Sequence, residues 1–183
     1  MRKWNAIISM TVLALFLVHA VVGGFQIIGV LPGGSPVMKW LAWIMAALIG
    51  VHAVIGIVLT VQTLHAQRKA GVSYPKENRL FWTRRLSGFA VMLFIVCHLL
   101  IFAVQQGADG AIRLHPFGAA ELATQLLLVA SVAVHVLTNI KPLLIAMGAR
   151  GMRELFTDIL FVLTLLLLFM GAAFVIYLIR WNV

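Results

Sequence analysis

Apolar residues dominate five long runs of this chain, and short polar segments separate the runs. The runs cover about residues 4–30, 37–66, 80–106, 118–148 and 155–179. At a rise of about 1.5 Å per residue, each run is long enough as an α-helix to cross a hydrocarbon layer of about 30 Å. The strands of a membrane barrel would be shorter and would alternate apolar with polar positions. The pattern therefore predicts a single all-α domain, residues 1–183, with five transmembrane helices.

The composition agrees with a membrane protein and limits the chemistry. Of the 183 residues, 63% are hydrophobic and 10% are charged, and the mean hydropathy is +1.07, far from the balance of a soluble domain. The only cysteine is Cys97. This excludes an internal disulfide, a cysteine-held iron–sulfur cluster in this chain and covalent haem attachment through a C-x-x-C-H motif. A cofactor in this chain must therefore be held by other ligands.

Basic residues gather at alternate ends of the runs. Of the 14 lysines and arginines, only Lys39, Arg113 and Arg180 lie at the opposite set of ends. The positive-inside rule then predicts a cytoplasmic N-terminus and an outer C-terminus. The net charge of +9 follows from this topology rather than from nucleic-acid binding, because the basic residues are not interleaved with aromatic residues on one face.

The segment from Gln67 to Arg85 is the most basic part of the predicted cytoplasmic side, and it also carries Phe81 and Trp82. Two interpretations stay open. The segment is either a docking surface for a partner protein, or a contact with lipid headgroups in which the two aromatic residues belong to an interfacial belt.

Four of the six histidines lie inside apolar runs, one in each of the first four: His19, His52, His98 and His135. An ionisable group inside a membrane is costly, and it usually faces the bundle interior and has a partner. A single such histidine is more often a packing residue than a ligand, but four on consecutive helices favour a common purpose. Imidazole is a standard axial ligand of haem iron, and bundle cores build cofactor sites from facing helices. Four histidines match two b-type haems with two histidines each.

The residues near these histidines agree with a flat cofactor. Gly23 and Gly56 each follow a histidine by four residues, so each lies on the same helix face as that ligand. A missing side chain there would leave room for a macrocycle, although close packing of small residues is the alternative. In the fourth run, Ser131 is placed to support the ring of His135. The runs contain almost no carboxylates, so a carboxylate-bridged metal site is not expected.

With these features the chain resembles the membrane-anchor cytochrome b subunit of succinate:quinone and quinol:fumarate reductases, in its single-chain, five-helix, dihaem form. The resemblance covers almost the whole chain. It rests on the four histidines, on the sequence HAVIG at 52–56 and on RRLSG at 84–88, ten residues before His98. Other dihaem quinol cytochromes of respiratory complexes usually place two ligands on one helix. A carrier or structural membrane protein without haem is the alternative from another class.

The resemblance implies that His19 and His98 bind the haem farther from the cytoplasm, and that His52 and His135 bind the nearer one. Further cofactor-binding residues implied in this way are Gly23, Gly56, Arg84, Arg85 and Ser87, with Arg85 favoured as the partner of a haem propionate. The resemblance also implies a bacterial inner-membrane location and two partner subunits on the cytoplasmic face, an FAD flavoprotein and an iron–sulfur protein. The dicarboxylate chemistry would lie on a partner, with no catalytic residue in this chain.

A membrane quinone, menaquinone or another, is the implied electron donor or acceptor. Because the family binds quinone toward the distal haem, the candidate residues here are Gln26, Trp40, His115 and Glu121. The sequence departs from the family in one respect, since no acidic residue lies inside the second run or just before His135. Some relatives use carboxylates at these positions for quinol oxidation or proton return, so whether this chain has a transmembrane proton path stays open.

Overall fold

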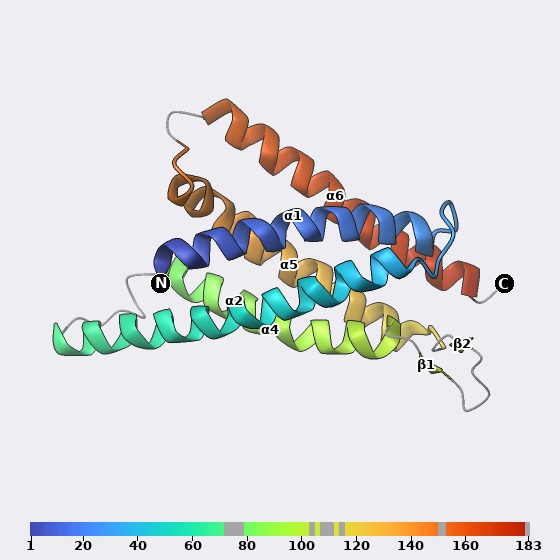
Figure 1. Cartoon of the computed structure of the whole chain (residues 1–183), viewed down its shortest axis with the longest axis horizontal. Helices are drawn as coiled ribbons and strands as arrows, with labels where there is room; N and C mark the ends of the chain where they lie inside the picture. Colours follow the sequence, from blue (N-terminus) through green and yellow to red (C-terminus); the bar gives the residue numbers. More distant parts are fainter. Residues whose placement is uncertain (72–78, 103–104, 107–111, 114–115, 150–152, 182–183) are drawn as a thin grey trace.

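The computed structural model describes residues 1–71, 79–102, 105–106, 112–113, 116–149 and 153–181. Most of these residues form the helices α1 (Arg2–Ile27), α2 (Pro36–Lys69), α4 (Arg79–Phe102), α5 (Ala119–Ala146) and α6 (Arg153–Trp181) (Figure 1). Each of the five is long and apolar enough to cross a membrane. The predicted helical architecture with five apolar spans is therefore confirmed, and it is the architecture of a multi-pass membrane protein.

Local chemistry sets the helix ends, which differ from the predicted ends by a few residues. α1 ends at Ile27 rather than at residue 30, and soon afterwards Gly29 has a φ of 81°, a left-handed conformation that glycine adopts readily. α2 begins at Pro36, whose ring suits the first turn of a helix. The Ser35 hydroxyl caps this helix by accepting a hydrogen bond from the Met38 N–H.

The predicted C-terminal end of the third helix, at residue 106, is wrong. α4 is helical as far as Phe102, and Gln105–Gln106 form the short strand β1. This strand pairs antiparallel with β2 (Ile112–Arg113), with Gln105 opposite Arg113. The two glutamines stand where the apolar run changes to a polar segment, so membrane burial no longer favours a helix there.

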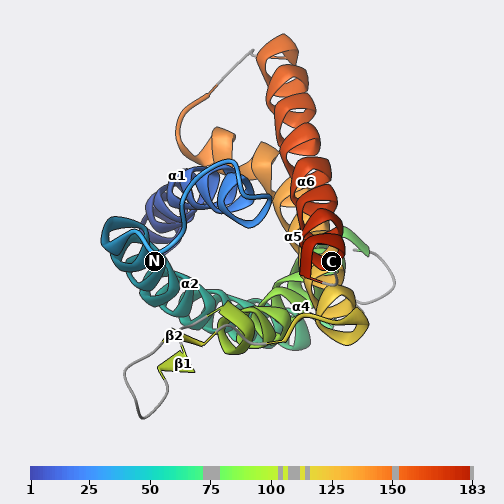
Figure 2. The same ribbon diagram turned by 90° about the vertical axis from the view of Figure 1, so that its right-hand side faces the viewer.

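The helices alternate in direction, so the two ends of the bundle differ (Figure 1). At one end, named the pocket end, α1, α4 and α6 finish and α2 and α5 start. At the other, named the arginine end because α4 begins there with Arg84 and Arg85 in its first turns, the order is reversed. α1 packs against α2 and α6, and α5 packs against α4 and α6. Figure 2, which looks onto the pocket end, shows the five helices arranged in a ring, with the first half of α6 leaning away.

Few side chains are buried, and large apolar side chains cover the outside of the bundle. The buried apolar residues are Ala6, Ala20, Phe117, Leu128, Ile140, Leu163, Leu167, Ala173 and Phe174. Among the described residues, α2 has no buried side chain and α4 has only Ser87. Exposed residues such as Trp43, Leu93 and Phe161 suit contact with lipid. Neighbouring helices therefore cover many of the described side chains of α2 and α4 only in part.

Candidate functional site

Four histidines form two pairs, and the two members of each pair come from different helices. The first pair consists of His19 in α1 and His98 in α4, whose ring centres are 6.2 Å apart with the ring planes inclined at 79°. The second pair consists of His52 in α2 and His135 in α5, with 6.3 Å between ring centres and an inclination of 80°. The structure thus brings together, two by two, the histidines that the family resemblance assigns to a common haem.

The separation within each pair has the value that one shared metal atom would require. A metal–imidazole bond of about 2 Å, with about 1.1 Å from the nitrogen to the ring centre, puts two imidazoles on opposite sides of a metal about 6 Å apart. Edge-to-face packing of two rings also occurs at about 4.5–7 Å. The distance alone therefore does not separate a ligand pair from a packing contact, and the hydrogen bonds of the rings are needed.

In the second pair, two serines fix the orientation of the rings. The Oγ of Ser9, in α1, lies 3.2 Å from Nδ1 of His52, and the Oγ of Ser87, in α4, lies 3.3 Å from Nδ1 of His135. Each hydroxyl donates its own hydrogen to a backbone carbonyl in the preceding turn of its helix. With their hydrogens used in this way, both serines can accept a hydrogen bond from a protonated Nδ1. This tautomer leaves the lone pair of Nε2 free, which is the form that binds a metal.

In the first pair, a side chain among the described residues hydrogen-bonds Nδ1 of only one of the two rings, that of His98. Nδ1 of His98 lies 2.8 Å from Oε1 of Gln125, in α5, and Gln125 has 0% of its surface exposed. An amide oxygen only accepts hydrogen bonds, so Nδ1 of His98 also carries the proton. Nδ1 of His19 is buried and has no hydrogen-bond partner among the residues that the structure describes. Three of the four imidazoles are thus held with Nε2 free, each by a side chain from a neighbouring helix.

The donor set fits a metal whose other ligands come from a planar cofactor. Within the described part of the chain, no group of three or more His, Cys, Asp or Glu side chains could hold a metal ion. A metal bound by protein side chains alone needs at least that number. Two imidazoles are sufficient when a macrocycle supplies the remaining ligands, as in a bis-histidine haem.

The two pairs occupy different levels of the bundle. Along α1, Ser9, which contacts the second pair, is ten residues from His19. Along α5, Gln125, which contacts the first pair, is ten residues from His135. At about 1.5 Å per residue, both intervals place the pairs about 15 Å apart along the bundle. The first pair is the one nearer the pocket end, because His98 lies in the last two turns of α4.

Glycines leave open space beside the histidines. A Cβ built on Gly23 would meet no atom within 4 Å, and on Gly56 the nearest atom would be Nη1 of Arg85, at 4.0 Å. Gly24 is different, because the ring of Phe169 from α6 lies directly against it. Gly24 therefore serves close helix packing, whereas Gly23 and Gly56 border space that a flat ligand could occupy.

The two arginines of the RRLSG sequence have different surroundings. Arg84 donates a hydrogen bond from Nε to the backbone carbonyl of Thr138 at 3.0 Å, which ties α4 to α5. The guanidinium carbon of Arg85 lies 5.2 Å from the centre of the Phe81 ring. Its Nε is buried and has no hydrogen-bond partner among the described residues.

Three further side chains at the arginine end have one buried polar atom that lacks a partner among the described residues: Asn5, Gln67 and Trp82. A buried donor without an acceptor is costly, and a buried cation without an anion is more so. The nitrogen atoms of Arg85 and Trp82 are donors that carboxylate groups would satisfy. An acidic ligand would therefore satisfy two of these four atoms, Arg85 Nε and Trp82 Nε1, whereas the amide oxygens of Asn5 and Gln67 need a donor.

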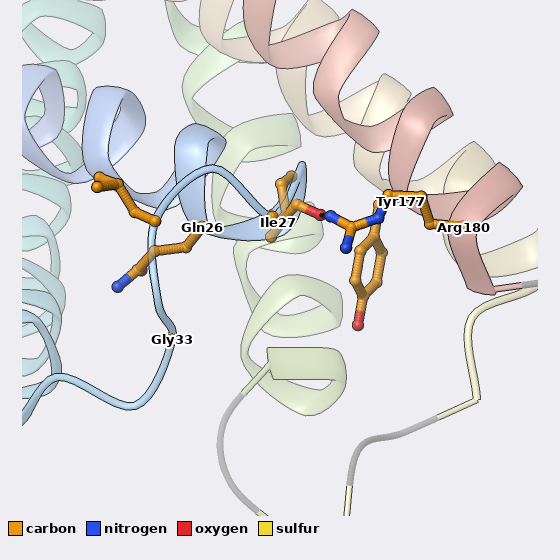
Figure 3. Close-up of a pocket in the computed structure, with 7 residues that line it drawn as sticks. Gln26, Ile27, Gly33, Tyr177 and Arg180 are labelled. Carbon is orange, nitrogen blue, oxygen red and sulfur yellow. Dashed lines mark hydrogen bonds between the residues drawn. The ribbon is translucent and has the colours of Figure 1, made fainter.

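A pocket of about 360 Å³ opens at the pocket end, beside the end of α1 and the last turns of α6 (Figure 3). Its lining residues are Gln26, Ile27, Gly29, Leu31, Gly33, Tyr177 and Arg180. Gln26 donates from Nε2 to the Pro32 carbonyl at 3.0 Å. Arg180 donates to the Ile27 carbonyl at 3.5 Å, and its guanidinium occupies the position that a Cβ on Gly29 would need.

Of the four residues predicted for a quinone, only Gln26 lines this pocket. Trp40 is 70% exposed on the first turns of α2. Glu121 accepts a hydrogen bond from the Gly118 N–H at 2.9 Å, so this carboxylate caps α5. His115 lies outside the described residues. Among the three described candidates, Gln26 is thus the one that lines the pocket, and the shared quinone site stays a prediction.

Aromatic rings connect the pocket with the first histidine pair. The ring centre of His98 is 5.0 Å from that of Phe102, which is 6.0 Å from Tyr177 at the pocket wall. Phe117 adds a ring 4.8 Å from Tyr177, and Phe174 lies 6.5 Å from His98. The pocket and the first pair thus belong to one continuous region of the bundle.

Sequence reasoning missed four of the residues that shape these sites: Ser9, Gln125, Tyr177 and Arg180. Gln125 had a visible signal, because a polar side chain inside an apolar run calls for a partner. Ser9 had none, since its contact with His52 spans two helices. The hydroxyl on the ring of His135 comes from Ser87 rather than from the predicted Ser131, because α4 packs along α5.

Comparisons with protein-family models, with curated proteins and with solved structures find no match to this chain.

Proposed function

We propose that the chain is the membrane-anchor cytochrome b subunit of a succinate:quinone or quinol:fumarate oxidoreductase. It carries electrons between a membrane quinone and an iron–sulfur subunit through two b-type haems, one for each histidine pair. The observation that carries the proposal is the second pair, with 6.3 Å between its ring centres and a serine on Nδ1 of each ring. A bound haem supplies one-electron chemistry, in which its iron alternates between the ferric and ferrous states.

The space and the charges around the pairs support haem as the ligand. Gly23 and Gly56 border open space one turn from a histidine in each pair. Haem carries two carboxylate groups, and the buried donors of Arg85 and Trp82 lie at the end of the bundle that the second pair is nearer to. A guanidinium can donate two parallel hydrogen bonds to one carboxylate. Arg85 would hold a propionate of the haem in the second pair.

The arginine end would face the cytoplasm of a bacterium and the pocket end would face outward, across the inner membrane. The positive-inside rule supports this orientation, because among the described lysines and arginines only Lys39, Arg113 and Arg180 belong to the pocket-end side. The FAD flavoprotein and the iron–sulfur subunit would bind at the arginine end. Electrons would then pass along the bundle between the first pair, the second pair and the iron–sulfur protein.

The pocket supports a quinone site next to the first pair. Its volume of about 360 Å³ lies within the usual range of small-molecule sites, about 300–1,000 Å³. Gln26 and Arg180 bring polar groups to its wall, and Tyr177 belongs to the aromatic cluster that leads to His98. Menaquinone or another membrane quinone would exchange electrons there with the haem of the first pair.

The experiment that tests the proposal is a reduced-minus-oxidised absorption spectrum of the chain purified from membranes, combined with a haem-to-protein ratio. We expect a b-type band and two haems per chain, because each histidine pair supplies two axial ligands. A folded chain, purified with its partners and without a b-type band, contradicts the proposal. That result would favour a carrier or a structural membrane protein.

Gly56, the glycine beside the second pair, leads to a prediction about the affinity for haem. Gly56→Leu should lower the affinity for the haem of the second pair roughly 5- to 150-fold, because overpacking costs about 1–3 kcal/mol. The haem of the first pair should be retained. The measurement is the haem content of the purified variant. Gly50→Leu is the control, because a Cβ on Gly50 would meet no atom within 4 Å and Gly50 points about 160° away from His52 on the same helix. Equal haem loss in both variants would contradict the prediction.

A further inference from the structure

Gln125 is the only polar side chain among the described residues that has no exposed surface. It lies in α5, inside an apolar span, where a polar group is expected to have a purpose. Its Oε1 is 2.8 Å from Nδ1 of His98 in α4. This is the shortest hydrogen bond that any of the four paired histidines makes through a side chain.

A directed series of hydrogen bonds fixes how the Gln125 amide is turned. Thr124 Oγ1 donates its hydrogen to the Glu121 carbonyl at 2.7 Å, so this oxygen is left as an acceptor. Gln125 Nε2 lies 3.1 Å from Thr124 Oγ1 and must be the donor there. The amide oxygen is consequently the group that faces His98. An amide rotated the other way would bring two acceptors together at Thr124, because the Thr124 hydroxyl has already donated its hydrogen to the Glu121 carbonyl.

This orientation determines the tautomer of His98. An oxygen acceptor at Nδ1 keeps the proton on that nitrogen, so the lone pair of Nε2 is free and points away from Gln125. A hydrogen bond from Nδ1 also makes the imidazole a stronger electron donor toward a metal. His19, the other ring of the first pair, has a buried Nδ1 without a partner among the described residues. The first pair is thus supported from the His98 side.

We propose that Gln125 is the positioning residue of the first histidine pair, which sets the tautomer of His98 and thereby the reduction potential of the metal that this pair binds. The proposal rests on the proposed function as far as the metal is haem iron. Thr124 acts behind Gln125 by keeping its amide oxygen toward the ring. No described residue supports Nδ1 of His19 in the same way, so Gln125 is the side-chain contact through which the described residues act on the first pair.

The test uses the full chain with its partners and compares Gln125→Met with Gln125→Glu. Methionine keeps the length but accepts no strong hydrogen bond, so it should weaken the preference for ferric iron about tenfold, which raises the potential of the first haem by about 59 mV. Glutamate retains an oxygen acceptor and should not raise it. Thr124→Val should shift the potential in the same direction as methionine, by less. The haem of the second pair should keep its potential in these three variants. Ser87→Ala serves as the matched change that should affect only the haem of the second pair.

A second measurement does not depend on haem. The ¹⁵N resonances of His98 in haem-free protein report which ring nitrogen carries the proton, and we expect Nδ1–H in the wild type and in Gln125→Glu, but a mixture in Gln125→Met. If the wild type binds no haem and still has this tautomer pattern, the proposed function fails and the positioning of His98 stands. If Gln125→Met leaves both the tautomer and the first haem unchanged, or shifts the two haems equally, the positioning proposal is overturned.

Discussion

Replacing His135 with alanine is expected to remove one haem from the chain and to leave the other with its normal spectrum. The haem-to-protein ratio should fall from two to one. The reason is that the 6.3 Å between the rings of the second pair fits one iron atom held from both sides, and one imidazole alone gives a weaker, five-coordinate site. His52→Ala should remove the same haem. His19→Ala and His98→Ala should each remove the haem of the first pair.

The measurements are haem content and potentiometry of the four single variants, each purified with its partners. His65→Ala is the control, since His65 is an exposed histidine of α2 outside both pairs and should leave two haems in place. Loss of the same haem in His19→Ala and His52→Ala would contradict the pairing, because these residues belong to different pairs about 15 Å apart along the bundle.

The sequence predicted the helices well because membrane burial leaves a strong record in it. About 20 consecutive apolar residues are needed for each span, so the five runs were visible without any tertiary information. The errors lie at the ends, where other forces act. α1 ends at Ile27, and the left-handed backbone of Gly29 follows two residues later. The glutamines after α4 form a strand that pairs with β2 and do not extend the helix.

The histidines could also be found from sequence, because an imidazole inside an apolar run is conspicuous. Their supporting residues could not. Ser9 and His52 are 43 residues apart, and His98 and Gln125 are 27 apart. Such contacts depend on which helices are neighbours and on how each is rotated, and the apolar runs record neither, since lipid accepts an apolar side chain on any face. Each of the four histidines also lies in the middle part of its apolar run, so the sequence gives them a similar depth. Only the contacts between helices separate the two levels.

The two arginines illustrate the same limit. On the helix their directions differ by about 100°, and periodicity did not decide which one faces the bundle interior. The structure separates them by their partners. Arg84 is engaged by the Thr138 carbonyl, while the guanidinium of Arg85 reaches toward Gly56 in α2 with a buried Nε that lacks a partner among the described residues.

Arg85→Gln is therefore expected to lower the reduction potential of the haem in the second pair, and Arg84→Gln is not. For a unit charge about 10 Å from a haem iron, at an effective dielectric constant of about 20, the interaction with the charge of the iron would be about 1.7 kcal/mol. This corresponds to a shift of about 70 mV for one electron. Removing the cation leaves the negative propionate uncompensated, which favours ferric iron and so lowers the potential.

Arg84→Gln is the matched control, because it removes an identical side chain from the adjacent position of α4. Glutamine there can still donate to the Thr138 carbonyl, so the contact between α4 and α5 should survive and the potential should stay near the wild-type value. Potentiometry of the two variants, with the haem of the first pair as an internal reference, gives the comparison. If Arg85→Gln binds two haems with unchanged potentials, the arginines only anchor α4 at the membrane surface, as the positive-inside rule alone would place them.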